Sequence, residues 1–218
     1  LGFESSWSVP AAVRCLPRYE LTSHSWTQVW HHAFNRGAYF PDSYETLFKY
    51  DAVIMTCGDV GRLLAIGRDM LRRYVQEGGG LVMLGGYYSY GKGHVRNTRF
   101  GELLPVQADS QWDLAQTPDT DIDNARLWFG LFPFPKGWKP SAYWIHRVKV
   151  RPEARVVWTC GGQPAVCVWN CGKGRVVTIT LTPLGAPPAG ASLFCQTPEW
   201  PSVLAQMLQW AGENGMAK

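Results

Sequence analysis

The sequence has few charged residues and no long hydrophobic run. Charged residues make up 17% of the 218 positions, below the roughly 25% that is typical of soluble domains. No stretch approaches the roughly 18 consecutive apolar residues that suggest a membrane span. No basic segment followed by an apolar stretch opens the chain, as a secretory signal would. We therefore expect a cytoplasmic protein with no membrane partner.

Cysteine is also scarce, and basic residues are only slightly in excess. Six cysteines in 218 residues are too few to suggest a disulfide-built domain. Cys167 and Cys171 are not accompanied by a second pair with metal-ligand spacing. The net charge of +4 is too small to argue for nucleic acid, and the basic set Lys92, Arg96 and Arg99 lacks a nucleic-acid motif. We expect reduced, buried thiols, no metal, no cofactor and no nucleic-acid partner.

Hydrophobic residues, in contrast, are plentiful at 46%, including 11 Trp, so the chain can bury a large core. Two short apolar runs, residues 50–57 and 81–84, are typical of strands buried on both faces. Between them, apolar residues at helical spacing over 63–76 predict a helix that ends at the glycines 78–80. Strand, helix and strand within about 35 residues predict a right-handed crossover and a parallel sheet.

The rest of the chain predicts further short elements. Helices are expected over residues 25–35, 43–48, 98–104 and 200–210, and strands over residues 143–150 and 155–159. Residues 164–169 and 175–181 flank a glycine-containing turn and predict a β-hairpin. Residues 107–142, whose first half is rich in aspartate, predict a surface excursion from a single domain that spans residues 1–218.

Three stretches, residues 50–60, 71–93 and 171–180, together resemble the putative glutamine amidotransferase-like family. The segment Glu4-Ser-Ser-Trp7 also resembles the opening of that family, with one extra residue. The resemblance implies an α/β fold of the flavodoxin-like type: a three-layer sandwich with a mainly parallel central sheet and a C-terminal β-hairpin.

The catalytic residues that the resemblance would imply are missing. Class I glutamine amidotransferases use a cysteine nucleophile on a tight strand-to-helix turn, a histidine that takes its proton, and a carboxylate that orients the histidine. The resemblance places this turn after residues 81–84, where the chain has Gly85, Gly86 and Tyr87. It places the histidine and the carboxylate in residues 182–188, which contain no His, Asp or Glu. We therefore expect no glutaminase activity by that route.

Other catalytic groups could lie at the same place, because ligands of doubly wound sheets bind outside the carboxyl ends of the strands. The candidates are Ser89, His94, Asp59 and Glu4, with a carboxylate orienting His94. In the alternative interpretation, His94 is a solvated loop histidine and Ser89 is a turn residue. Cys57 would be reactive if it were exposed at a helix N-terminus, and is otherwise a buried structural thiol.

Aromatic side chains near the same turn could form a wall suited to stacking on a sugar or another ring. Tyr87, Tyr88, Tyr90 and Trp7 are the residues concerned, although tyrosines also simply cover a glycine-rich backbone. The predicted ligand-binding set is Trp7, Gly58, Asp59, Gly85, Gly86, Tyr87, Tyr88 and Lys92.

Three hypotheses about function remain. The first is a protein without glutaminase activity that binds a small molecule at the former active-site crevice. The second is a hydrolase of another class that acts there on a sugar-like or amide substrate; it requires a carboxylate within hydrogen-bond reach of His94. The third is a homo-oligomeric assembly module that uses the aromatic residues of 128–135 and Trp138. Those aromatics could equally cover the monomer's own sheet.

Overall fold

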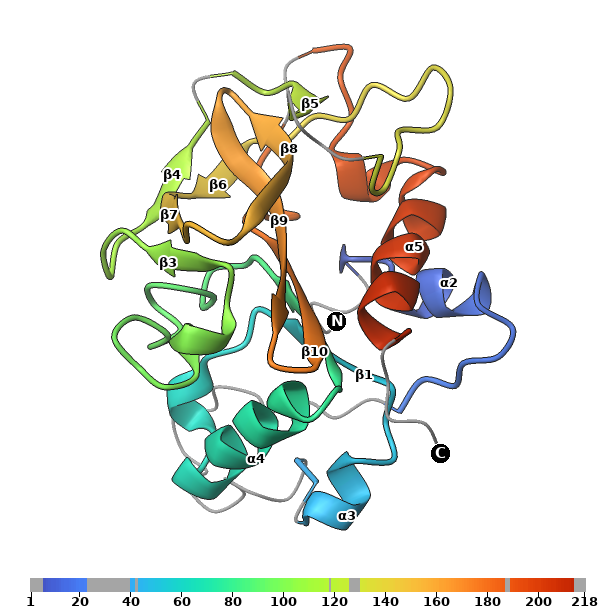
Figure 1. Ribbon diagram of the computed structural model, residues 1–218. Helices are drawn as coiled ribbons and strands as arrows, with labels where there is room; N and C mark the ends of the chain where they lie inside the picture. Colours follow the sequence, from blue (N-terminus) through green and yellow to red (C-terminus); the bar gives the residue numbers. More distant parts are fainter. Residues whose placement is uncertain are drawn as a thin grey trace, which may run out of the picture.

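The computed structural model describes residues 6–22, 40–41, 43–117, 119–125, 130–186 and 189–213. Its main element is a six-stranded sheet with the order β1-β2-β10-β9-β8-β5 (Figure 1). In that order the strands are β1 (Ala52–Thr56), β2 (Gly80–Leu84), β10 (Gly174–Ile179), β9 (Gln163–Cys171), β8 (Arg155–Cys160) and β5 (Ile122–Asn124).

Only half of this sheet is parallel. β1 pairs with β2 and β2 with β10 in parallel, as the crossover pattern predicts, and the predicted β9–β10 hairpin is present. The other three pairings, β10–β9, β9–β8 and β8–β5, are antiparallel, so the prediction of a mainly parallel sheet is correct only in part. For β10–β9 and β9–β8 the reason is the short turns at Gly172–Lys173 and Gly161–Gly162, since a parallel pair needs a connection of a dozen residues or more.

Helices cover both faces of the parallel half (Figure 1). α4 (Ala65–Gln76) lies on one face, where its side chains pack with Leu81 and Met83 of β2. α5 (Trp200–Gly212) and α2 (Val9–Arg14) lie on the other face, which receives Val82 and Leu84. Successive residues of β2 thus feed two different cores, as the alternation of side chains along a strand requires. β2 is fully buried for this reason.

The remaining helices are short. α3 (Tyr44–Leu47) begins after Ser43, whose hydroxyl accepts a hydrogen bond from the Thr46 amide at 3.2 Å, so Ser43 is an N-cap. The predicted helix over 98–104 is a single 3₁₀ turn, η2 (Gly101–Leu103). Two further 3₁₀ turns are η1 (Val60–Arg62) and η3 (Phe194–Gln196). The helix predicted over 25–35 lies outside the described residues.

The predicted strand over 143–150 is two strands with different partners. β6 (Trp144–His146) pairs with β4 (Leu114–Gln116), and β7 (Val148–Val150) pairs with β3 (Val106–Ala108). The segment 107–142 therefore supplies β4, most of β3 and the edge strand β5. These pairings bring the start of β4 and the end of β6 next to β2.

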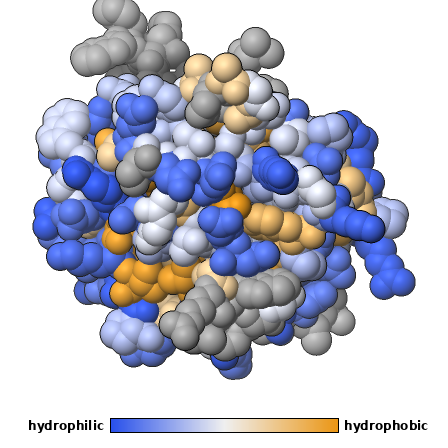
Figure 2. Space-filling model, turned by 90° about the horizontal axis from the view of Figure 1, so that it is seen from above, coloured by the Kyte–Doolittle hydropathy of each residue, from blue (hydrophilic) through white to orange (hydrophobic). Residues whose placement is uncertain are grey.

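The aromatic segment proposed for assembly is largely used inside the monomer. Phe132 and Trp138 are buried, and Trp138 and Phe134 pack against Trp158 of β8. Trp128 lies outside the described residues. The face of the molecule in Figure 2 is mainly hydrophilic, with hydrophobic atoms gathered in small areas. In the described part of the chain no helix is long and apolar enough to cross a bilayer.

Candidate functional site

Two glycines in the turn after β2, Gly85 and Gly86, have no room for a side chain. A Cβ atom added to Gly85 would overlap the carbonyl oxygen of Leu181, and one added to Gly86 would lie 2.9 Å from the Sγ atom of Cys57. Gly86 also has a φ of +158°, a region that glycine adopts more readily than other residues. Packing therefore excludes a side chain at either of these two glycines.

Cys57 lies at the end of β1, beside this turn. Its φ of +47° is unusual for a residue with a Cβ atom, and such strain is found mainly at constrained or functional positions. Its thiol accepts a hydrogen bond from the Tyr88 amide at 3.3 Å. Burial raises the pKa of this thiol, and backbone hydrogen bonds from Tyr88 and Tyr87 only partly oppose the rise. A raised pKa keeps the thiol protonated near neutral pH, which is the opposite of an activated nucleophile.

Asp59 and His94 lie within ion-pair distance of each other at the same edge of the sheet. His94 Nδ1 lies 2.8 Å from Asp59 Oδ1, and that oxygen also accepts a hydrogen bond from the Gly61 amide at 2.9 Å. The Asp59 side chain is 6% exposed, whereas the His94 side chain is 60% exposed. The loop of His94 is tied to the end of β1 because the Val60 amide donates to the Gly93 carbonyl at 2.9 Å. The pair thus presents an exposed imidazole oriented by a buried carboxylate.

The imidazole of His94 borders two adjoining depressions, of about 420 and 460 Å³. Asp59 lines the first and Arg99 the second, and Arg68 of α4 lines both. The Arg68 guanidinium is held in place because its Nη1 donates to the Leu63 carbonyl at 2.8 Å. These depressions are of a size that a small molecule could occupy.

Other predicted site residues lie elsewhere. The Ser89 hydroxyl is fully buried and donates to the Leu84 carbonyl at 2.9 Å, so it is not presented as a nucleophile. Tyr90 is buried, with its hydroxyl donating to the Ile179 carbonyl at 3.0 Å. Trp7 is buried against Phe194 and Trp200 on the α5 side of the sheet. Glu4 lies outside the described residues.

Tyr87, Lys92 and Trp112 form an exposed group that we call the aromatic–lysine cluster. The Nζ atom of Lys92 lies 3.7 Å from the centre of the Tyr87 ring and 4.5 Å from that of the Trp112 ring. Tyr87 is 44% exposed and Trp112 is 66% exposed. Tyr88 packs edge-on against Tyr87, with ring centres 4.9 Å apart. The sequence predicted Tyr87, Tyr88 and Lys92 as ligand-binding residues but missed Trp112, a lone tryptophan in a polar segment.

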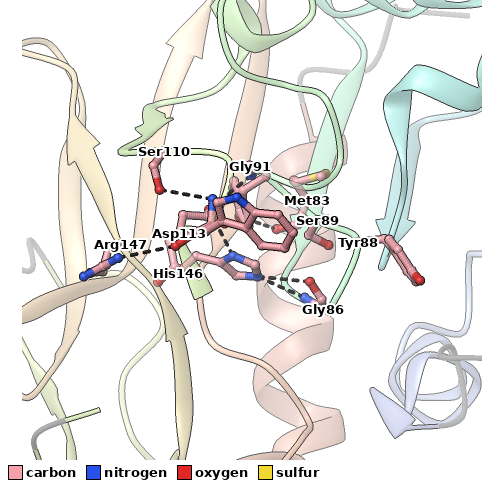
Figure 3. A network of polar contacts seen from close by, with 12 residues as sticks. Met83, Gly86, Tyr88, Ser89, Gly91, Ser110, Asp113, His146 and Arg147 are labelled. Carbon is pink, nitrogen blue, oxygen red and sulfur yellow. Dashed lines mark hydrogen bonds and ion pairs between the residues drawn. The ribbon is translucent and has the colours of Figure 1, made fainter. Parts of the chain in front are cut away.

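Asp113, which follows Trp112 in the chain, forms a buried pair with His146 that the sequence also missed (Figure 3). His146 Nδ1 lies 3.1 Å from Asp113 Oδ2, and the two side chains are 1% exposed or less. Nε2 of His146 lies 3.3 Å from the amide nitrogen of Gly86 and 3.1 Å from its carbonyl oxygen. If the imidazole is neutral and its Nδ1 donates to Asp113, its Nε2 accepts a hydrogen bond from the Gly86 amide. If the imidazole is protonated, its Nε2 donates to the Gly86 carbonyl oxygen. In both states His146 is engaged with the backbone of Gly86.

The buried pair joins the segments that carry the cluster. Asp113 Oδ2 also accepts a hydrogen bond from the Gly91 amide at 3.1 Å, next to Lys92, and Asp113 directly follows Trp112. Its Oδ1 has no hydrogen-bond partner among the described residues. No three His, Cys, Asp or Glu side chains in the described part of the chain form a group that could hold a metal ion.

The parallel strands with helices on both faces define an α/β protein, with a turn of two glycines after its second parallel strand. Over residues 18–212 the chain matches the family model described as "Putative glutamine amidotransferase", so it belongs to this family. No curated protein matches the chain.

Several solved structures share the fold. Two are described as cytoplasmic proteins of Salmonella typhimurium: STM1381 is 23% identical with a TM-score of 0.68, and STM3548 is 22% identical with a TM-score of 0.65. Each match covers 79% of this chain and 76% of the other. A ThuA-like protein from Parabacteroides merdae is 15% identical with a TM-score of 0.64, covering 98% of this chain and 87% of that one. At these identities the likeness concerns the fold alone.

Proposed function

We propose that this protein is a cytoplasmic member of its family that lacks glutaminase activity and binds a small ring-shaped molecule at the carboxyl ends of its parallel strands. The observation that carries the proposal is the aromatic–lysine cluster. Tyr87 and Trp112 keep 44% and 66% of their surface exposed, although burying large rings is favourable. Exposed aromatic rings beside the edge where such sheets bind ligands are suited to stacking on a sugar or another ring.

Three features of the edge support the proposed lack of glutaminase activity. Gly85 and Gly86 of the turn after β2 leave no space for a side chain. The neighbouring thiol of Cys57 has a raised pKa. The buried His146 is bonded to the Gly86 backbone. Steady release of ammonia from glutamine by the purified protein, abolished by Cys57→Ala, would contradict this part of the proposal.

A thermal-shift screen against sugars, sugar phosphates, nucleotides and amino acids tests the binding. A ligand present at about 100 times its Kd stabilises the fold by about 2.7 kcal/mol, which raises the Tm by roughly 5–11 °C for a chain of this size. We expect Tyr87→Ala and Trp112→Ala to abolish the shift. Tyr44→Ala is the matched control, because Tyr44 is an exposed tyrosine on α3. Shifts that survive both cluster variants, or no shift across the panel, would refute the proposal.

A second function is favoured by one specific observation, the 2.8 Å contact between His94 and Asp59. An exposed imidazole oriented by a buried carboxylate is the arrangement of a general base. Because the Ser89 hydroxyl is bonded to the backbone, His94 would activate a water molecule rather than a serine. The candidate reaction is hydrolysis of a sugar-like or amide substrate in the depressions that His94 borders.

Chromogenic glycosides and amides test this hydrolase function. We expect His94→Gln to lower any turnover by about 10²–10⁴-fold, and Arg96→Gln, an exposed change in the same loop, to leave it unchanged. Equal turnover by the wild type and His94→Gln would exclude His94 as the base.

A further inference from the structure

We infer that the aromatic–lysine cluster selects ligands that carry a negative charge on or beside their ring. This inference rests on the proposed ring-binding function and names the chemical class of the ligand. Its basis is the ammonium group of Lys92, which lies between the two exposed rings at 3.7 and 4.5 Å from their centres. A ligand stacked on either ring therefore lies next to a fixed positive charge.

Lys92 has capacity left for an anionic partner. Ring faces attract an ammonium through their quadrupole but do not neutralise its charge. In the described part of the chain, the ion pairs that the structure contains do not include Lys92. Its three N–H donors can thus bond carboxylate or phosphate oxygens, and such charge-assisted bonds are stronger than neutral ones.

The charges around the cluster also favour an anion. Of the carboxylates in neighbouring segments, Asp113 is buried against His146, Asp109 lies 3.7 Å from the Nζ atom of Lys149, and Asp59 is bonded to His94. A positive group lies close by, since Arg147 Nη2 donates to the Trp112 carbonyl at 3.3 Å. A cationic ligand would have to displace Lys92 from between the rings and would meet this positive charge. The cluster therefore discriminates against cations as well as attracting anions.

Backbone segments that carry cluster residues are tied to the buried pair, whose polar contacts Figure 3 shows. The Trp112 amide donates to the Ser110 hydroxyl at 3.1 Å, and Asp113, the next residue, is bonded to His146 and to the Gly91 amide. Gly91 precedes Lys92 in the chain. The backbone segments that carry the indole and the ammonium are thus anchored to one network, so a ligand has less motion to restrict when it binds.

Matched pairs of probes, identical except for charge, test the inference: glucose 6-phosphate against glucose, and benzoate against benzamide. Binding is followed by ¹⁹F NMR of protein labelled with 5-fluorotryptophan, and the Trp112 resonance is assigned with Trp112→Phe. We expect the charged member of a pair to bind at least about ten-fold more tightly, as one added charge-assisted hydrogen bond implies. Lys92→Gln should remove this preference, and Lys136→Gln, the same change on an exposed lysine of the segment 130–138, should preserve it.

The outcomes separate the two proposals. Equal binding of charged and neutral probes at Trp112 would overturn the inference about charge and leave the ring-binding function standing. A charge preference that survives Lys92→Gln would also overturn it. Failure of every probe to move the Trp112 resonance would refute ring binding at the cluster, and the inference with it.

Discussion

The described part of the chain contains two aspartate–histidine pairs at the same edge of the sheet, and they differ in burial. In both pairs Nδ1 of the histidine contacts the carboxylate, at 2.8 Å between His94 and Asp59 and at 3.1 Å between His146 and Asp113. The His94 side chain is 60% exposed, whereas that of His146 is 0% exposed. Exposure of the imidazole, and not the pairing itself, separates a group that can act on a ligand from one that holds the backbone.

Removing a partner from the buried pair should have the largest effect on stability. We expect His146→Ala and Asp113→Ala each to lower the free energy of unfolding by about 3–5 kcal/mol, because the remaining polar group is left buried without its partner. The Gly86 and Gly91 backbone groups would also lose hydrogen bonds. Urea unfolding measures the change. A loss below about 1 kcal/mol would mean that the buried pair contributes no more than an exposed one.

This buried pair is also the feature that sequence reasoning could not find. Periodicity located β1, α4 and β2, and the glycine turn located the β9–β10 hairpin, because each signal lies within one segment. Asp113 and His146 meet because β4 pairs with β6, with Leu114 opposite His146. These strands have three residues each, too few for a pattern, and their pairing is not local. Trp112 was missed for the same reason, since its position follows from that of Asp113.

Asp59 lies beside the end of β1, where it contacts His94, and Tyr87 lies beside the end of β2, where it contacts Lys92. Residues after parallel strands gather at one edge of a sheet. The sequence could not predict the directions of side chains. Trp7 points into the core, and the Ser89 hydroxyl points to the backbone. Both directions depend on packing that only the folded chain defines.

Buried thiols should give the next largest effect on the free energy of unfolding, at alkaline pH. Burial raises the pKa of Cys160 and Cys167 to about 12 and that of Cys195 to about 11, against about 8.5 for a free thiol. Because the folded pKa lies above the unfolded one, the stability from these neutral thiols is complete below about pH 8.5 and is lost as the pH rises towards 11 and 12.

The free energy of unfolding should therefore fall between pH 8 and 9.5, by about 1 kcal/mol for each of these thiols. Urea unfolding at the two pH values measures the slope of the free energy of unfolding against pH. Cys167→Ala should reduce the slope, whatever its effect on stability at pH 8. A slope that is the same with and without Cys167 would show that its thiol does not titrate in this way.

The smallest effect on stability is expected at the exposed pair, His94 and Asp59. His94→Gln should change the free energy of unfolding by less than about 1 kcal/mol, because an exposed ion pair contributes little, while the same substitution at His146 disturbs a buried network. Any activity or ligand binding in the depressions beside His94 should show the opposite order. It should fall strongly in His94→Gln, the variant that changes stability least. If His94→Gln destabilised the protein as much as His146→Gln and left binding and turnover unchanged, the exposed pair would be structural. The carboxyl ends of the strands would then owe their function to the aromatic–lysine cluster alone.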